Sequence, residues 1–309
     1  MKLNRFSRFA WLVLGYNLLV VLWGAFVRAT GSGAGCGSHW PLCNGEVVPR
    51  APQVETIIEF THRLTSGVAL LVVVWMLIWA FRAFPPGHVV RKGAAWSMFF
   101  IITEALVGAG LVLFEWVAHD ASLGRVISMA VHLVNTFLLL AALALTAWWG
   151  SGGEALNLKG HGVQTWLFGF GFLMMLVLGV SGAVTALGDT LFPSASLAEG
   201  LREDFSAEAH FLVRLRVWHP VIAILTGVYL LFLAGFVAMF RVNPTIRKFA
   251  AALAGLFVIQ GIAGLINLAL LAPVWMQLVH LLLADLVWLS LVLLAAANFA
   301  KSELSINSA

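Results

Sequence analysis

Long apolar stretches, separated by short polar segments, make up most of this chain. A helix that crosses the hydrocarbon core of a bilayer, about 30 Å thick, needs roughly 20 predominantly apolar residues. Eight windows of about that length carry few charges: 9–27, 64–81, 93–114, 126–149, 162–188, 217–240, 249–272 and 274–300. The two-residue alternation that is typical of a membrane β-barrel is absent from them. The pattern therefore predicts eight transmembrane helices and an all-α integral membrane protein.

The composition agrees with this prediction and excludes other classes of protein. Of the 309 residues, 61% are hydrophobic and only 10% are charged, whereas a soluble domain carries about 25% charged residues. The 13 Trp and 22 Phe exclude a disordered chain. No basic run stands out, so we expect contact with membrane lipid and none with nucleic acid. The first apolar stretch exceeds the 7–15 residues of a cleaved signal peptide, which predicts a retained helix.

The distribution of positive charges predicts the orientation in the membrane. Short cytoplasmic loops are rich in Lys and Arg. With the N-terminus inside, all five lysines fall in cytoplasmic segments, and the opposite side carries most of the acidic residues. We therefore expect both termini to be cytoplasmic and the long loops at about 28–61 and 189–216 to lie outside. The protein is expected to be a multi-pass protein of the plasma membrane, the inner membrane of a bacterial cell.

The two halves of the chain match each other weakly, helix by helix and in the same order. The corresponding segments are 61–67 and 218–221, 104–108 and 260–264, and 131–133 and 279–281. Because each half holds four helices, both halves enter from the same side, and a pseudo-twofold axis would run along the membrane normal. We expect two four-helix bundles, residues 1–150 and residues 151–309, with 154–159 as the linker.

Four of the nine histidines occupy equivalent places in the two halves. His62 and His219 are expected to open the second and sixth helices, whereas His132 and His280 lie deeper, about 10 Å from the helix start at 1.5 Å per residue. Ionisable groups inside a membrane are costly and usually functional, so these pairs indicate a metal site or a proton relay. Zinc would need further ligands nearby, whereas two imidazoles on facing helices suit haem iron. One haem per half is therefore expected.

Other polar residues in or beside the predicted helices allow two interpretations each. The arginines expected at the outer rim are Arg63, Arg125, Arg214 and Arg216. They could meet haem propionates or act as ordinary interfacial anchors. Glu104 and Asp285 lie inside predicted helices, where they are candidates for a functional polar role in the bundles or, as we expect, for interhelical hydrogen bonds.

The only two cysteines, Cys36 and Cys43, lie in the first outer loop. The outer side of a bacterial membrane is oxidising, so this pair can form a disulfide. The intervening Gly and Pro permit a small closed loop. The bond could be a structural staple, or it could take part in redox chemistry beside His62.

Three motifs resemble the bacterial haem A synthase family: residues 24–33 (GAFVRATGSG), 36–43 (CGSHWPLC) and 59–63 (EFTHR). The eight predicted helices and the four repeated histidines are similar to that family as well, so the resemblance extends over nearly the whole chain. The C-terminal half matches mainly through His219 and His280. Some members carry a second cysteine pair between the fifth and sixth helices, and this sequence has none there.

This resemblance implies an enzyme that oxidises a ring methyl of haem O to a formyl group, giving haem A for terminal oxidases. It implies a permanent haem b at His219 and His280 and the substrate haem at His62 and His132. Glu59 precedes His62 by three residues and so shares its helix face; it would move protons or stabilise a cation there, or be only a first-turn acid. The implied partners are a haem O synthase and an electron acceptor or donor of unknown identity. A homo-oligomer is compatible with the sequence.

Two other functions stay open. A di-haem b membrane cytochrome, which passes electrons between a quinol and a partner, would use the same four histidines, but it would not need Glu59 or the cysteine loop. A transporter built from parallel repeats would bind no haem.

Overall fold

The computed structural model describes residues 3–240 and 243–300. The expected bundles, 1–150 and 151–309, therefore each include terminal residues that lie outside the described ones, namely 1–2 and 301–309. The long helices are α1 (Arg5–Ala29), α2 (Val54–Ala83), α3 (Val89–Leu113), α4 (Leu123–Gly150), α5 (Gly162–Leu191), α8 (Trp218–Phe240), α9 (Pro244–Ala269) and α10 (Val274–Asn298). The short ones are η1 (Ser32–Ala34), α6 (Leu197–Asp204) and α7 (Phe211–Leu215). Eight membrane-length apolar helices are therefore confirmed, the sixth span comprising α7 and α8.

Polar residues define where several of these helices begin. The side chain of Asn4 accepts a hydrogen bond from Ser7 N at the start of α1, and Ser122 caps α4 in the same way. Asn243 caps α9, where Pro244 occupies the first turn. The Asn4 amide also donates to Gly150 O at 2.8 Å, which fastens the start of α1 to the end of α4.

The second helix begins earlier than the sequence pattern predicts. The apolar window starts at residue 64, but α2 starts at Val54. Residues 54–63 mix polar and apolar side chains, so a search for apolar windows misses this part of the helix. His62 therefore does not open the helix, and Glu59 is not a first-turn acid: both lie on the continuous helix, beyond its first turn. The loop before α2 is correspondingly shorter than the predicted 28–61.

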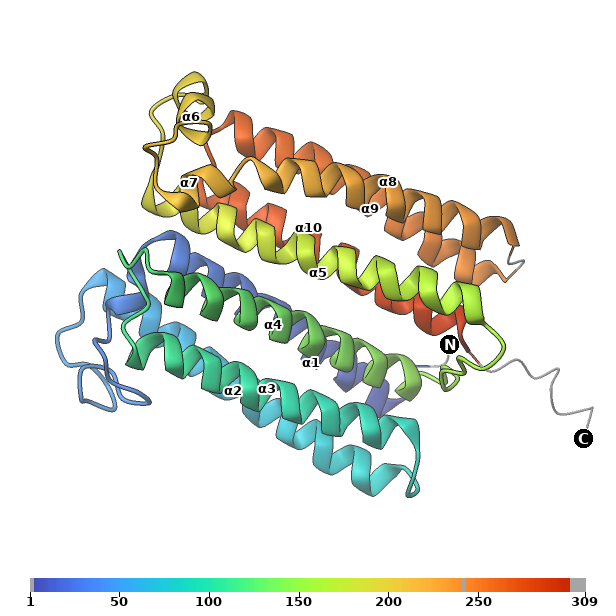
Figure 1. Ribbon diagram of the computed structural model, residues 1–309. Coiled ribbons are helices and arrows are strands. Elements are labelled where there is room, and N and C mark those ends of the chain that lie inside the picture. The colour runs from blue at the N-terminus through green and yellow to red at the C-terminus, as the bar shows by residue number, and fades with distance from the viewer. Residues whose placement is uncertain (1–2, 241–242, 301–309) are drawn as a thin grey trace, which may run out of the picture.

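The long helices run side by side in two groups (Figure 1). Helices α1, α2, α3 and α4 pack around one another, as do α5, α8, α9 and α10, and α4 meets α10 between the groups. The start of α1 and the end of α10 lie at one end of the helices, whereas the loop after α1 lies with α6 and α7 at the other end (Figure 1). This arrangement gathers the two long loops on one side.

Two kinds of contact join the groups. In the core, the ring of Trp288 stacks on Phe137 with centroids 4.8 Å apart, and its Nε1 donates to Phe137 O at 2.7 Å. At the end of α1 that carries the long loop, Arg28 donates to Thr190 Oγ1 at 2.8 Å and to Gln277 Oε1 at 2.7 Å. Helix α1 is thereby tied to both α5 and α10.

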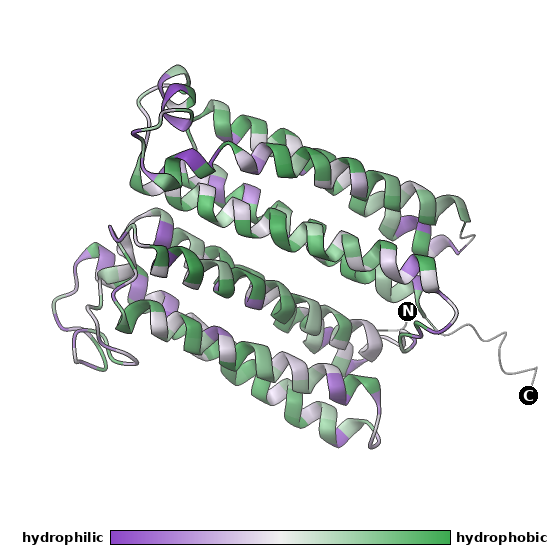
Figure 2. Cartoon of the chain, in the orientation of Figure 1, coloured by the Kyte–Doolittle hydropathy of each residue, from purple (hydrophilic) through white to green (hydrophobic). Residues whose placement is uncertain are grey.

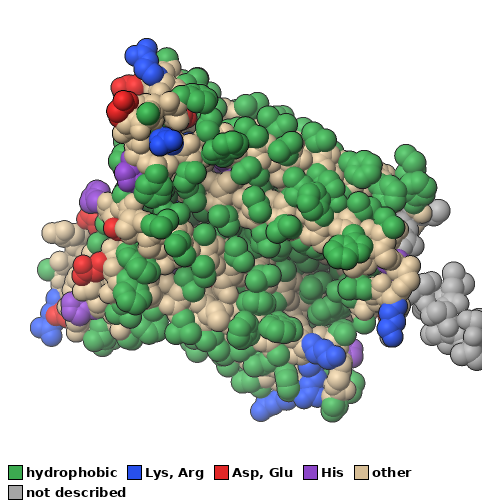
Figure 3. Space-filling model, in the orientation of Figure 1, with side chains coloured by type: hydrophobic (Ala, Val, Ile, Leu, Met, Phe, Trp, Pro, Cys, Tyr) green, Lys and Arg blue, Asp and Glu red, His purple; other side chains and the backbone are tan. Residues whose placement is uncertain are grey.

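Apolar residues dominate the length of the helices, and polar residues gather near their ends (Figure 2). On the face shown in Figure 3, hydrophobic side chains cover the middle of the molecule and charged ones lie at its two ends. Many large apolar side chains of the long helices are exposed on the surface of this chain, as expected where lipid rather than water surrounds the helices. The surface is that of an integral membrane protein.

Candidate functional site

The loop between α1 and α2 is closed by a disulfide between Cys36 and Cys43, with Cα atoms 4.4 Å apart. This confirms the predicted pairing. Both cysteines are buried. Asn44 N donates to Cys36 O, and Cys43 N donates to Glu46 O, each at 2.9 Å. The loop is therefore an ordered structure rather than an open connection.

Glu59 fastens this loop to α2. Its side chain is only 3% exposed. One carboxylate oxygen accepts from Cys36 N at 2.8 Å, and the other accepts from Arg63 Nη2 at 2.5 Å. Arg63 Nη1 in turn donates to the carbonyls of His39, at 2.6 Å, and Leu42, at 2.5 Å. The guanidinium of Arg63 therefore binds the cysteine loop. The sequence alone suggests that it would meet a haem propionate or act as an interfacial anchor.

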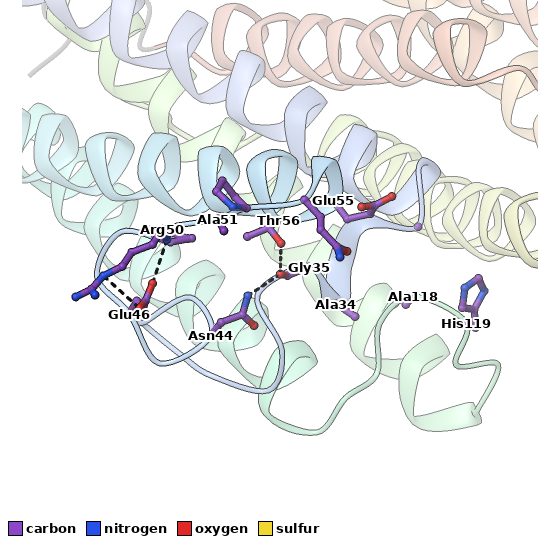
Figure 4. Close-up of a pocket in the computed structure, with 14 residues that line it drawn as sticks. Ala34, Gly35, Asn44, Glu46, Arg50, Ala51, Glu55, Thr56, Ala118 and His119 are labelled. Carbon is purple, nitrogen blue, oxygen red and sulfur yellow. Dashed lines mark hydrogen bonds and ion pairs between the residues drawn. The ribbon is translucent and has the colours of Figure 1, made fainter.

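A polar cavity of about 640 Å³ opens beside the same loop (Figure 4). The polar residues that line it are Asn44, Glu46, Gln53, Arg50, Glu55, Thr56 and His119. Thr56 Oγ1 and Asn44 Nδ2 both donate to Gly35 O, at 2.7 and 3.2 Å. None of the residues predicted for the site is among those that line this cavity.

His62 packs against a glycine of the neighbouring helix. A Cβ atom at Gly24 of α1 would lie 2.9 Å from His62 Cε1, so the close approach requires glycine here. Nδ1 of His62 is buried and has no hydrogen-bond partner among the described residues. His62 on α2 and His132 on α4 belong to the same group of helices.

His132, on α4, faces an acidic side chain of α3. Its Nδ1 lies 3.4 Å from Glu104 Oε1, which is within ion-pair distance, but it makes no hydrogen bond among the described residues. Glu104 itself accepts from Asn135 Nδ2 at 2.5 Å and from Thr136 Oγ1. Each carboxylate oxygen of Glu104 thus accepts one hydrogen bond, and Oε1 also faces the imidazole of His132.

His219 and His280 face each other across the second group of helices. Their ring centroids are 6.3 Å apart, with planes at 83°. Ser181 Oγ lies 3.0 Å from Nδ1 of His219. Gln260 Nε2 lies 3.2 Å from Nε2 of His280. Cβ atoms at Gly182 and at Gly264 would come within 3.0 Å of the Cε1 atoms of His219 and His280, respectively.

This geometry fits an iron held between two imidazoles. A metal lies about 2.0–2.1 Å from an imidazole nitrogen, and each nitrogen lies about 1 Å from its ring centroid, so two rings that share one metal have centroids roughly 6 Å apart. The observed 6.3 Å agrees with this distance. His219 and His280 would hold the iron of a haem here, and the haem would supply one-electron redox chemistry.

The other charged residues singled out from the sequence have mostly structural contacts. Arg125 donates to the carbonyls of Ala118 and Asp120, both at 2.7 Å. Arg216 contacts Asp189 at 3.2 Å and Asp204 at 2.9 Å. Arg214 is exposed. Asp285, 0% exposed, has no hydrogen-bond partner among the described residues, so the interhelical bond expected for it is not made there.

Several residues that shape the site do not stand out from the sequence reasoning. Asn135 and Thr136 follow His132 by three and four residues on an apolar helix, a spacing that places them on its face. That spacing could have identified them. Arg28 and its partner Gln277 could not have been paired from sequence, because their contact joins α1 to α10.

Fold and site together define a polytopic helical membrane protein with half-buried histidines on its spans and a disulfide-closed loop bound to Arg63, next to His62 in sequence. The COX15-CtaA family, described as "Cytochrome oxidase assembly protein", matches residues 7–292. The chain belongs to this family.

Curated relatives carry two different names. Proteins of two Thermus thermophilus strains, both named "Protoheme IX farnesyltransferase", are 58% identical over 281 residues, which is 91% of this chain but 46% of theirs. The chain thus spans about half the length of these relatives. A Shouchella clausii protein named "Heme A synthase" is 48% identical over 97 residues, 31% of this chain and 32% of the relative. Another of that name, from an Exiguobacterium species, is 32% identical over 189 residues, 61% of this chain and 60% of the relative.

Proposed function

We propose that this chain is a haem A synthase, an oxidoreductase that converts a ring methyl of haem O to a formyl group. The observation that carries the proposal is the family match, because residues 7–292 include all four repeated histidines and the cysteine loop. Relatives that match parts of this region are named "Heme A synthase". The enclosed histidine pairs supply a chemical reason for a haem-based reaction in this scaffold.

The Thermus relatives support a specific partner. Their name states farnesyl transfer to protohaem IX, and more than half of their length lies outside the match to this chain. Haem O is a farnesylated protohaem, so the enzyme that makes it would supply this chain's substrate. We propose a haem O synthase as a partner. Oxidation of a methyl group also needs an oxidant, so an electron acceptor or donor is a second proposed partner.

The proposed architecture is two four-helix bundles, residues 1–150 and 151–309, related by a pseudo-twofold axis along the membrane normal. Equivalent glycine contacts support it: Gly24 faces His62 in one half, and Gly182 faces His219 in the other. Both termini are proposed to be cytoplasmic, and the cysteine loop is proposed to lie on the outer side. The clustering of all five lysines on one side of the predicted topology supports this orientation.

We propose that His219 and His280 hold a permanent haem b. The 6.3 Å between their ring centroids and the contact of Ser181 with Nδ1, which is the other nitrogen of the His219 ring, support this assignment. Ser181, beside Nδ1 of His219, would fix the orientation of that ring. A haem bound here would supply one-electron redox chemistry to the neighbouring half.

We propose that His62 and His132 bind the substrate haem and orient it for oxidation. Glu59, one helical turn before His62, would place a fixed negative charge near this site. Its two contacts, with Cys36 and Arg63, also make the position of the carboxylate depend on the closed cysteine loop. That dependence gives the disulfide a role in shaping the substrate site, whether or not it exchanges electrons.

Pigment analysis tests the proposal. The chain would be expressed in bacterial cells that make haem O and lack their own haem A synthase, and the haems would be extracted and separated. Haem A in these cells, and its absence from cells carrying the empty vector, is the expected result. A purified protein with haem b but no conversion of haem O would favour the di-haem b cytochrome. A protein without a Soret band would contradict both haem functions.

A further inference from the structure

The two deeper histidines face different side chains at equivalent places of the two halves. Glu104 of α3 lies beside Nδ1 of His132, whereas Gln260 of α9 lies beside Nε2 of His280. The segments 104–108 and 260–264 correspond in the repeat, so a carboxylate in one half is replaced by a neutral amide in the other. The halves therefore present different charges to their histidines.

A polar network holds the Glu104 carboxylate, and its parts are missing from the other half. Asn135 and Thr136 donate to the two carboxylate oxygens, and Thr103 Oγ1 donates to Asn135 Oδ1 at 2.6 Å. The residues at the corresponding places of the second half are Ile259, Leu283 and Ala284, whose side chains carry no polar atom. The corresponding helices α9 and α10 therefore pack without such a network. This difference suggests that the network serves a specific purpose between α3 and α4.

We propose that Glu104 is a positioning residue for His132: its carboxylate faces the unpartnered Nδ1 at 3.4 Å, accepts a hydrogen bond from Nδ1–H once a haem is bound, and so directs Nε2 toward the substrate haem. This inference rests on the proposed function. A histidine that binds a metal usually donates its other ring N–H to a carboxylate, carbonyl or water, which fixes the ring and makes the binding nitrogen more basic. With Glu104 as its partner, His132 would be a stronger donor to a bound haem iron than a histidine beside a neutral amide, which would favour the oxidised state.

Two exchange variants test this inference, because each gives one half the residue of the other at nearly constant size. Glu104→Gln should weaken haem O binding 10- to 100-fold and make the reduction potential of bound haem O more positive. It should leave the potential of haem b unchanged. Gln260→Glu should make the potential of haem b more negative because it adds a negative charge beside His280, although at Nε2 rather than at Nδ1. The measurements are spectroelectrochemical titrations and haem O binding to the purified full-length protein.

The control is Asn135→Leu, which installs the residue found at position 283 and leaves the Glu104 charge in place. It should weaken haem O binding less than Glu104→Gln does. Wild-type affinity and potential in Glu104→Gln would overturn the inference, and so would equal shifts of both haems, which indicate a general loosening of the protein. A wild-type protein that binds no haem O, or His132→Ala that binds it normally, would instead refute the proposed function.

Discussion

Replacing Gly264 by Ala tests the close packing of a glycine against a histidine ring. The added Cβ would lie 3.0 Å from Cε1 of His280, whereas contacting carbon atoms lie about 3.5–4.0 Å apart. Either the ring or α9 must therefore move by roughly 0.5–1 Å. Overpacking of this kind costs about 1–3 kcal/mol. The shift would also disturb the 6.3 Å spacing between His280 and His219 that suits an iron.

Gly261→Ala is the matched control, since a Cβ at Gly261 of the same helix would meet nothing within 4 Å. Both variants gain the same helix propensity, about 1 kcal/mol, so the difference between them isolates the contact with His280. We expect Gly264→Ala to hold haem b about 5- to 150-fold more weakly than Gly261→Ala, because 1.4 kcal/mol is a factor of ten. The assay is haem b content after purification and haem transfer to apomyoglobin. Equal retention in the two variants would refute the reasoning.

Two further predictions concern the cysteine loop. Mass mapping without reductant should find Cys36 and Cys43 linked, and two freely alkylated thiols in fresh membranes would contradict the disulfide. Cys→Ala variants should lose activity but keep the haem b spectrum, because the loop is bound to Glu59 of α2 in the N-terminal half. Glu59→Gln should keep haem b but form little haem A. The variant should also melt at a lower temperature, because loss of one partner of a buried ion pair costs about 3–5 kcal/mol and leaves the charge of Arg63 uncompensated. Wild-type amounts of haem A would assign Glu59 a purely structural role.

Helix number and order could be predicted from sequence, whereas some helix ends could not. Long apolar windows identify spans because lipid leaves no other way to satisfy the backbone. The apolar pattern misses the start of α2 because the first ten residues of that helix, 54–63, mix polar and apolar side chains. The short helices α6 and α7 lie in a polar loop, where no apolar window marks them.

The candidate histidines could be found from sequence because an imidazole in an apolar span is conspicuous. Their surroundings could not, since spacing along one helix does not reveal which side chain of another helix faces it. The contact of Gly24 with His62 and that of Glu104 with His132 arise from packing between helices. Arg63 shows the same limit: the sequence places it at the rim, but only the fold shows that it binds the loop carbonyls.

The division of labour between the two histidine pairs is the central claim, and single Ala variants of His62, His132, His219 and His280 test it most directly. The measurement is a reduced-minus-oxidised spectrum with pigment analysis of each variant. Loss of His219 or His280 should remove or weaken the low-spin haem b signal. Loss of His62 or His132 should leave that signal and abolish haem A formation. Loss of haem b in the N-terminal variants alone would reverse the assignment of halves, and loss of the same haem in all four would place one site between them.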